Sequence, residues 1–277
     1  MYKIQPIERL IQIDDLVAVY DYVRPKGFYF PGESHDFWEC VYIHEGVVTA
    51  TADERVYQLD AGKLLIHKPM EFHRIWASED CAPWVINISF HAHGVLCRQL
   101  YDRCFDLSPE QQEQFLKIVE IFTSLDVLKT QNETRKYRSN LNLIATLLES
   151  FLLNLSDNKE YAAHNQLPND ERYSKIVQIM QNNREKNLSL SELANLCQMS
   201  VSNMKRIFRM YSDVGIAKYY LTLRMRYAME LLSSGMSISA VSDALHFSDA
   251  TYFYTVFKRE TGVTPSQYRR EKRNHKT

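Results

Sequence analysis

The chain has 277 residues, 45% apolar and 24% charged, which is typical of a soluble globular protein long enough for two domains. Its net charge of −1 conceals two halves of opposite sign: residues 1–167 carry 16 Lys and Arg against 24 Asp and Glu, and residues 168–277 carry 17 against 10. This asymmetry excludes a uniformly basic protein and indicates that only the second half meets a polyanion.

The cysteines and apolar segments restrict the cellular context. The five cysteines are scattered and never spaced C-x-x-C, which is typical of reduced thiols. This spacing also makes a structural zinc site an unfavoured interpretation. The first residues lack the profile of a secretion signal, and no apolar run approaches the ~18 residues of a membrane span. We therefore expect a cytoplasmic protein without a membrane partner.

Short apolar segments broken by turn residues run from about Phe28 to His91. Many short strands at this spacing predict a β-barrel or β-sandwich, which we assign to a first domain of residues 1–107. The expected strands are Phe37–Ile43, Val47–Thr51, Val56–Leu59, Leu64–His67, Phe72–Trp76 and Trp84–Phe90.

The apolar period then changes from strand-like to helical. Ser108, Pro109 and Gln111 form a helix-start signal, and two amphipathic helices are expected at about 109–128 and 136–155. We expect this helical hairpin, residues 108–156, either to pair two monomers or to cover the barrel. Residues 157–170 lack apolar periodicity and are the expected linker.

Residues 171–277 contain one pattern twice. Each copy has a short amphipathic helix, a tight turn and a second helix, which is the helix-turn-helix pattern. Leu190, Leu193 and Met199 of the first copy match Ile238, Val241 and Phe247 of the second at an offset of 48 residues. Met204 and Phe208 match Phe253 and Phe257 at an offset of 49, so one residue has been inserted at the turn. The repeat predicts two DNA-binding units.

If Met204, Ile207 and Phe208 pack inward, the opposite face of that helix points outward, as does its counterpart in the second unit. We expect Arg206 to contact guanine, and Arg209 and Lys258 to contact phosphate. The alternative is that both faces are merely solvated. The predicted DNA-binding residues are Ser202, Lys205, Arg206, Arg209, Thr251, Tyr254, Thr255 and Lys258.

A helix expected at Ala217–Leu232 joins the two units. Sixteen residues rise roughly 24 Å, so the recognition helices could lie about one DNA turn, ~34 Å, apart. Two successive major grooves on one face of a duplex would then be reachable by one chain.

The last 105 or so residues resemble the AraC/XylS family of bacterial transcription regulators. The resemblance rests on Arg224-x-x-x-Ala228-x-x-Leu231-Leu232, Ile238, Val241, Phe247, Tyr252-Phe253, Phe257-Lys258, Gly262, Thr264-Pro265 and Tyr268-Arg269. Three departures stand out. His246 and Asp213 occupy positions where the family usually has glycine, and Asp213 is expected to tolerate a left-handed backbone. Thr255 replaces a common arginine, which implies weaker or altered base reading by the second unit.

The strand-rich part resembles the cupin-like barrel that many members of this family carry. The segments Glu33–Glu39, His44–Gly46 and Pro69–His73 carry this resemblance. Metal-binding cupins use H-x-H, a Glu and a distant His; here Glu33 stands at the first His position, and one strand would place Glu33, His35 and Glu39 on one side. The resemblance favours an organic effector, with a sugar as one candidate, and no metal or other cofactor. The expected effector-binding residues are His35, Glu39, Trp38, His73 and Trp84.

The resulting prediction is an α+β protein, a cupin-like β-barrel with a helical hairpin followed by an all-α DNA-binding domain. We expect a ligand-responsive, sequence-specific regulator without catalytic residues, an activator of carbohydrate genes that binds promoter DNA as a homodimer and contacts RNA polymerase. Two alternatives remain: a metal-dependent cupin enzyme fused to a DNA-binding domain, and a constitutive DNA-binding protein with a structural barrel.

Overall fold

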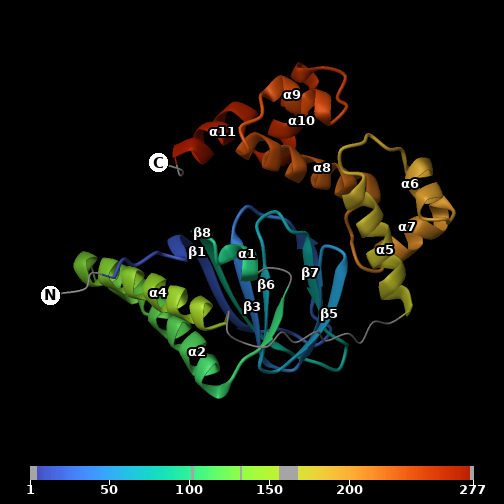
Figure 1. Ribbon diagram of the computed structural model, residues 1–277. Helices are drawn as coiled ribbons and strands as arrows, with labels where there is room; N and C mark the ends of the chain where they lie inside the picture. The colour runs from blue at the N-terminus through green and yellow to red at the C-terminus, as the bar shows by residue number, and fades with distance from the viewer. Residues whose placement is uncertain (1–4, 101–102, 132, 156–167, 275–277) are drawn as a thin grey trace. The chain divides into compact units, whose positions relative to one another are not determined.

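A computed structural model describes residues 5–100, 103–131, 133–155 and 168–274 (Figure 1). These residues form two compact units, each with its own core. The first contains the nine strands of the described chain and helices α1–α4, and the second contains α5–α11. The predicted fold class, a β-rich domain followed by a helical helix-turn-helix domain, is confirmed. No helix among these residues has the length and apolar character needed to cross a bilayer.

The strands of the first unit form two sheets. The five-stranded sheet has the order β1-β8-β3-β6-β9, and the four-stranded sheet has the order β2-β7-β4-β5. The strands are β1 (Gln12–Val23), β2 (Tyr29–Glu33), β3 (Trp38–Glu45), β4 (Val47–Ala52), β5 (Arg55–Asp60), β6 (Lys63–His67), β7 (His73–Trp76), β8 (Trp84–His93) and β9 (Cys104–Asp106). All six predicted strands are present, whereas β1, β2 and β9 were not predicted.

Two apolar clusters lie on opposite faces of the five-stranded sheet. Val41 and Val85 face the four-stranded sheet and pack with Val48, Ala50 and Leu59. Because side chains alternate along a strand, the neighbouring residues face the other way. There Trp38, Tyr42, Ile86 and Phe90 pack against the helices. The space between the sheets is therefore separate from the core beneath the helices.

The four helices that come after β8 in the chain cover this second face. They are α1 (Cys97–Leu100), α2 (Pro109–Thr123), α3 (Leu125–Thr130) and α4 (Thr134–Leu155). The predicted start of α2 is present as a capping box, in which Ser108 and Gln111 cap each other's backbone N–H groups. Phe115, Ile144 and Phe151 are fully buried in the shared core. The apolar faces of the helical hairpin, α2 and α4, therefore pack inside the first compact unit.

The second unit consists of seven helices within the described residues. They are α5 (Pro168–Asn182), α6 (Leu190–Leu196), α7 (Val201–Arg209), α8 (Ile216–Ser233), α9 (Ile238–Ala244), α10 (Ala250–Thr261) and α11 (Pro265–Asn274). The pairs α6–α7 and α9–α10 are the predicted helix-turn-helix units, and α8 is the predicted connecting helix. Of the expected linker, residues 157–167 lie outside the described residues, and 168–170 belong to α5.

The turns of the two helix-turn-helix units show where a left-handed backbone conformation is needed. Gln198 (φ 57°) and His246 (φ 54°) lie in this region, each just after the first helix of its unit. His246 thus occupies a position that glycine would adopt without strain. Asp213 does not have a positive φ, so the tolerance for left-handed backbone expected of it is not needed there. Helix α7 ends in a right-handed cap at Met210, whereas α10 ends at Gly262 with φ 79°.

Candidate effector site and nucleic-acid interface

The first unit contains a cavity of about 420 Å³. Inward-facing residues of β3, β7 and β8 form its polar end, where Glu39, His73 and Asn87 lie close together. Glu33 and His67 also line this end. An aromatic wall with one cation lies on β1, β2 and the segment between them: Tyr20, Tyr22, Arg24, Phe28 and Phe30. The cavity therefore combines hydrogen-bonding groups with flat apolar faces.

Glu39 is at the centre of the polar end. Its side chain is 8% exposed, and its two oxygens accept hydrogen bonds from Asn87 Nδ2 at 3.0 Å and Ser89 Oγ at 3.1 Å. Its carboxylate lies 3.6 Å from His73 Nε2 and 3.9 Å from His35 Nε2. Burial raises the pKa of Glu39 above its ordinary value. A cation or a proton donor in the cavity would stabilise its charged form.

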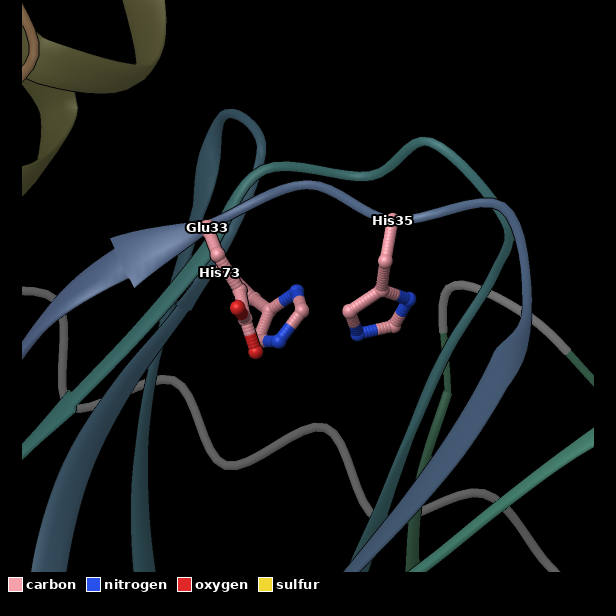
Figure 2. Close-up of side chains that lie close together, drawn as sticks. All are labelled: Glu33, His35 and His73. Atoms are coloured by element: carbon pink, nitrogen blue, oxygen red, sulfur yellow. The ribbon is translucent and has the colours of Figure 1, made fainter. Parts of the chain in front are cut away.

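Glu33, His35 and His73 converge from separate elements (Figure 2). Glu33 ends β2 and pairs across the sheet with His73, the first residue of β7. His35 lies in the segment between β2 and β3, and its ring is 4.8 Å from that of His73. The expectation that one continuous strand aligns Glu33, His35 and Glu39 was wrong, since the strand is interrupted after Glu33.

Close approach of β2 to β7 depends on Gly32. Its φ is +98°, and a Cβ atom there would lie 2.6 Å from Phe72 Cζ and 2.8 Å from the His73 carbonyl oxygen. The register of the two strands also shifts between Phe30 and Glu33. A glycine at this bulge therefore allows Glu33 to reach His73.

Both imidazoles of this group are neutral at pH 7. Burial lowers the pKa of His35 to about 4, aided by the neighbouring His73. Burial likewise lowers the pKa of His73 to about 4, aided by His67, whose ring stacks on it at 4.3 Å. Each ring therefore offers one donor nitrogen and one lone pair.

The aromatic wall holds the cavity's cation. The guanidinium of Arg24 lies 5.2 Å from the centre of the Tyr22 ring and 5.0 Å from that of Phe28. Tyr20 and Tyr22 are half exposed, at 47% and 53%, so this part of the wall borders solvent. Arg24 is thus held beside aromatic faces and forms no salt bridge with a carboxylate of the described residues, so it can bind a polar or anionic ligand.

The structure brings together some of the predicted effector residues and separates others. Glu39 and His73 line the cavity, and His35 adjoins it. Trp38 does not reach it, because it alternates with Glu39 and packs into the core beneath the helices. Trp84 likewise faces away from the cavity-lining Val85, and its indole Nε1 donates to Asp21 Oδ1 at 2.6 Å. For these two tryptophans the structure contradicts the prediction.

The aromatic wall itself was missed by the sequence reasoning. The run Tyr20-Asp21-Tyr22-Val23-Arg24, followed by Phe28-Tyr29-Phe30, is unusually aromatic and contains a lone arginine. That density of flat side chains beside a cation is the signal that could have indicated a ligand site.

The exposed face of α7 is as predicted. Met204, Ile207 and Phe208 are buried, whereas Ser202, Lys205, Arg206 and Arg209 are all exposed. The helix starts at Ser200, whose hydroxyl accepts from the Asn203 N–H at 3.2 Å. Arg206 Nη2 donates to Asn203 Oδ1 at 3.0 Å, an exposed contact and the one hydrogen bond of this guanidinium with the described residues.

Helix α10 presents the equivalent face of the second helix-turn-helix unit. Phe253, Val256 and Phe257 are buried. The helix begins at Asp249, which accepts from the Tyr252 N–H at 2.7 Å. The predicted DNA-binding side chains on the opposite face are all exposed: Thr251, Tyr254, Thr255 and Lys258. Exposure is what DNA contact requires, and the contacts themselves remain predictions.

A buried arginine links the connecting helix α8 to the second helix-turn-helix unit. Arg224 of α8 is 4% exposed, and its guanidinium lies 4.7 Å from the centre of the Phe247 ring. It donates to the Leu245 carbonyl and, at 3.0 Å, to Asn187 Oδ1. Leu245 is the C-cap residue that follows α9, so Arg224 fixes the turn before α10 relative to α8.

Comparison with known proteins also identifies a ligand-binding domain followed by a helix-turn-helix domain. Residues 19–177 match the model of an AraC-like ligand binding domain, and residues 193–271 match that of a helix-turn-helix domain. The Msm operon regulatory protein of Streptococcus mutans is 24% identical over 257 residues, covering 90% of each chain. The transcriptional activator RhaR of Yersinia pseudotuberculosis is 24% identical, covering 87% of this chain and 84% of that one.

One solved structure is also similar. It is a transcriptional regulator with an AraC-type DNA-binding domain from Chromobacterium violaceum, 28% identical over 37% of this chain and 92% of that chain, with a TM-score of 0.35. The match of the ligand-binding model to more than half of the chain defines the class, a DNA-binding protein with an effector domain. This chain belongs to the AraC family of transcription regulators.

Proposed function

We propose that the protein is a sequence-specific transcription regulator whose affinity for promoter DNA depends on a small molecule bound in the cavity of the first unit. The observation that carries this proposal is the pair of exposed recognition faces, Ser202–Arg209 and Thr251–Lys258, on a duplicated scaffold. The same chain carries a lined cavity of about 420 Å³, within the size range of small-molecule sites.

We propose a polyhydroxylated molecule such as a sugar as the effector. Glu39, His73 and Asn87 supply acceptors and a donor at one end of the cavity. Tyr22 and Phe28 supply flat faces at the other, beside the Arg24 guanidinium. Aromatic faces combined with a few hydrogen-bonding groups suit a ring that is apolar on its faces and polar at its edge.

We propose that the protein acts by binding and not by catalysis, in the cytoplasm, as a homodimer that activates transcription through RNA polymerase. The relatives from Streptococcus mutans and Yersinia pseudotuberculosis are named as an operon regulatory protein and as a transcriptional activator, which supports regulation and, less directly, activation. The exposed Leu143 and Leu153 of α4 support pairing through the helical hairpin.

A gel-shift experiment with the full chain tests DNA recognition. The duplex upstream of the protein's own gene should bind at least ten-fold more tightly than a shuffled duplex of the same length, because base contacts add to phosphate contacts. Equal affinity for both duplexes would contradict sequence-specific regulation through this site.

A thermal-shift screen against sugars and small acids tests the effector. A ligand that binds the folded state raises its unfolding temperature in proportion to the logarithm of ligand concentration. The Arg24→Gln variant should lose most of the shift, whereas Lys117→Gln, an exposed change on α2, should keep it. A ligand whose shift is unaffected by Arg24→Gln would place the effector site elsewhere.

A further inference from the structure

The exposed faces of the two recognition helices differ in chemistry. Three positions of α7 that carry cations correspond to positions of α10 at the offset of 49 residues. The pairs are Lys205 and Tyr254, Arg206 and Thr255, and Arg209 and Lys258. All of these side chains are exposed. The shared scaffold therefore presents a cationic surface on α7 and, in the first half of α10, a neutral one.

The neutral half of α10 is a poor match for guanine. Guanine offers two acceptors, O6 and N7, on its major-groove edge. Arg206 of α7 can bind both, because its guanidinium carries five N–H donors and Asn203 Oδ1 accepts from one of its nitrogens. A hydroxyl group has a single proton, so neither Tyr254 nor Thr255 can do the same. Residues 250–255 also contain no amide side chain, which is the usual partner of adenine.

The hydroxyl group of Thr255 is already used within the helix. Thr255 Oγ1 donates to the Thr251 carbonyl oxygen at 3.0 Å, one turn earlier. This bond occupies the hydroxyl proton and leaves the Cγ2 methyl group on the other branch of Cβ. Tyr254 lies beside it with 38% of its surface exposed. The centre of the α10 face therefore combines a methyl group with an aromatic ring.

A carboxylate at the start of α10 adds discrimination against bases rich in acceptors. Asp249 accepts from the Tyr252 N–H at 2.7 Å and from Ser248 Oγ at 3.2 Å. The corresponding cap of α7 is the neutral Ser200. A negative charge at this position repels the acceptor pair of guanine, so the two helices differ at their first turns as well.

Thymine presents a C5 methyl group beside an O4 acceptor in the major groove. Tyr254 and Thr255 each have an apolar part beside a hydroxyl oxygen, which matches that edge. We propose that α10 recognises its half of the DNA site through the methyl groups of thymine, whereas α7 recognises its half through guanine. The inference rests on the sequence-specific DNA binding proposed above and adds the base surface that each helix contacts.

Replacement of thymine by uracil in the DNA tests the inference, because the two bases differ only by the methyl group. The DNA is a duplex selected from a random pool by the full chain. The segment that stays protected in the variant with Lys205→Ala and Arg206→Ala is the one that α10 contacts. Deoxyuridine in this segment should lower the affinity about four-fold for each contacted methyl group, the factor expected for one methyl-sized apolar contact.

Base analogues in the other segment give the reciprocal result. Deoxyuridine in the segment that α7 contacts should leave the affinity unchanged within error. A guanine analogue that lacks the N7 acceptor should weaken binding there, since Arg206 then loses one of its two acceptors. The same analogue in the α10 segment should have no effect.

Two variants of Thr255 identify the group that reads the base. Thr255→Ser removes only the methyl group and should bring the thymine-to-uracil affinity ratio at one position to about one. Thr255→Val replaces the hydroxyl with a second methyl group and should keep that ratio above one. Thr222→Ser is the matched control, because Thr222 Oγ1 makes the same type of bond to the Lys218 carbonyl oxygen, at 3.1 Å, on α8. It should change neither the affinity nor the ratio.

The outcomes separate this inference from the proposed function. A uracil substitution without effect in the α10 segment, or an equal loss in both segments, overturns the inference and leaves sequence-specific binding intact. A ratio that survives in Thr255→Ser and disappears in Thr255→Val also overturns it, since the hydroxyl would then read the base. A random pool that yields no preferred sequence overturns the proposed function and this inference together.

Discussion

Arg206 is the residue on which we expect base recognition by the first helix-turn-helix unit to depend most. It is exposed near the middle of α7, and within the part of the chain that the structure describes its guanidinium hydrogen-bonds to Asn203 alone. We predict that Arg206→Ala weakens binding to the cognate duplex by about 1–3 kcal/mol and relaxes preference at one base pair, since a guanidinium can bind both acceptors of guanine. Fluorescence anisotropy with single-base variants of the duplex measures both effects.

Arg209→Ala is the matched control for Arg206→Ala. Arg209 lies at the end of the same helix, where we expect phosphate contact. Its loss should weaken binding equally on all sequences and reduce the slope of log affinity against log salt by about one. If Arg206→Ala instead behaves like Arg209→Ala, the base contact assigned to Arg206 is wrong.

His246 has a strained backbone conformation in the turn of the second helix-turn-helix unit. Its φ of 54° lies in the left-handed region, and its side chain is exposed. We predict that His246→Gly raises the free energy of unfolding by about 0.5–1 kcal/mol, because relief of strain exceeds the added freedom of the unfolded chain. Urea unfolding measures the change. Ala244→Gly, two residues earlier in α9, should lower stability by a similar amount; a loss of stability in both variants would rule out the strain.

Gly32 is needed for the contact between β2 and β7. We predict that Gly32→Ala lowers the unfolding temperature of the first unit by several degrees, since its Cβ would clash with Phe72 and the His73 carbonyl. Gly215→Ala, where no atom lies within 4 Å of the added Cβ, should change it little. Differential scanning calorimetry compares the two, and similar small effects would show that the strands have room to separate.

The sequence predicted the proximity of residues marked by their chemistry, and it did not predict the orientation of their neighbours. Glu39 and His73 line the cavity and His35 adjoins it, and all three were chosen because imidazoles and carboxylates recur in a known spacing. Their role in effector binding stays a prediction. Trp38 was assigned to the cavity although it neighbours Glu39, and neighbours in a strand face opposite sides. The backbone carbonyl groups that lie 3.1 Å from His35 Nδ1 and from His73 Nδ1 are contacts of the folded chain, which the sequence does not reveal.

Among the elements, β1 and β2 were missed for identifiable reasons. Strand β1 has register shifts between Ile13 and Asp15 and between Leu16 and Ala18. Each shift interrupts the two-residue period by which a strand is recognised. Strand β2 contains Pro31 and Gly32, which normally indicate a turn. The cavity's aromatic wall lies on these strands and the segment joining them, so it was missed with them.

The hairpin of α2 and α4 was predicted with an undecided role. Its buried stripes pack inside the first unit, yet Leu143 and Leu153 of α4 remain 46% and 37% exposed. We predict that the parent chain has the mass of a dimer in light scattering and that Leu143→Glu with Leu153→Glu reduces it to a monomer. Leu196→Glu, exposed on α6, should leave the dimer intact. A dimer that survives the double change would exclude pairing through this face.

At the scale of the whole molecule, acidic and basic charge are divided between two units with different tasks. The duplicated helix-turn-helix pattern was readable because each copy must bury the same apolar positions around its own turn, as Val241, Phe253 and Phe257 do. We expect the spacing of α7 and α10 along DNA to follow from the length of α8, which runs from Ile216 to Ser233. We expect both helices to enter successive major grooves on one side of the duplex.

Hydroxyl-radical footprinting of the full chain tests this central claim most directly, on a duplex selected from a random pool. We predict two protected segments about 10 base pairs apart on one face, of which the first is lost with Lys205→Ala and Arg206→Ala, and the second with Thr251→Ala and Lys258→Ala. A pool that yields no preferred sequence, or a single segment unaffected by either pair of substitutions, would contradict the account.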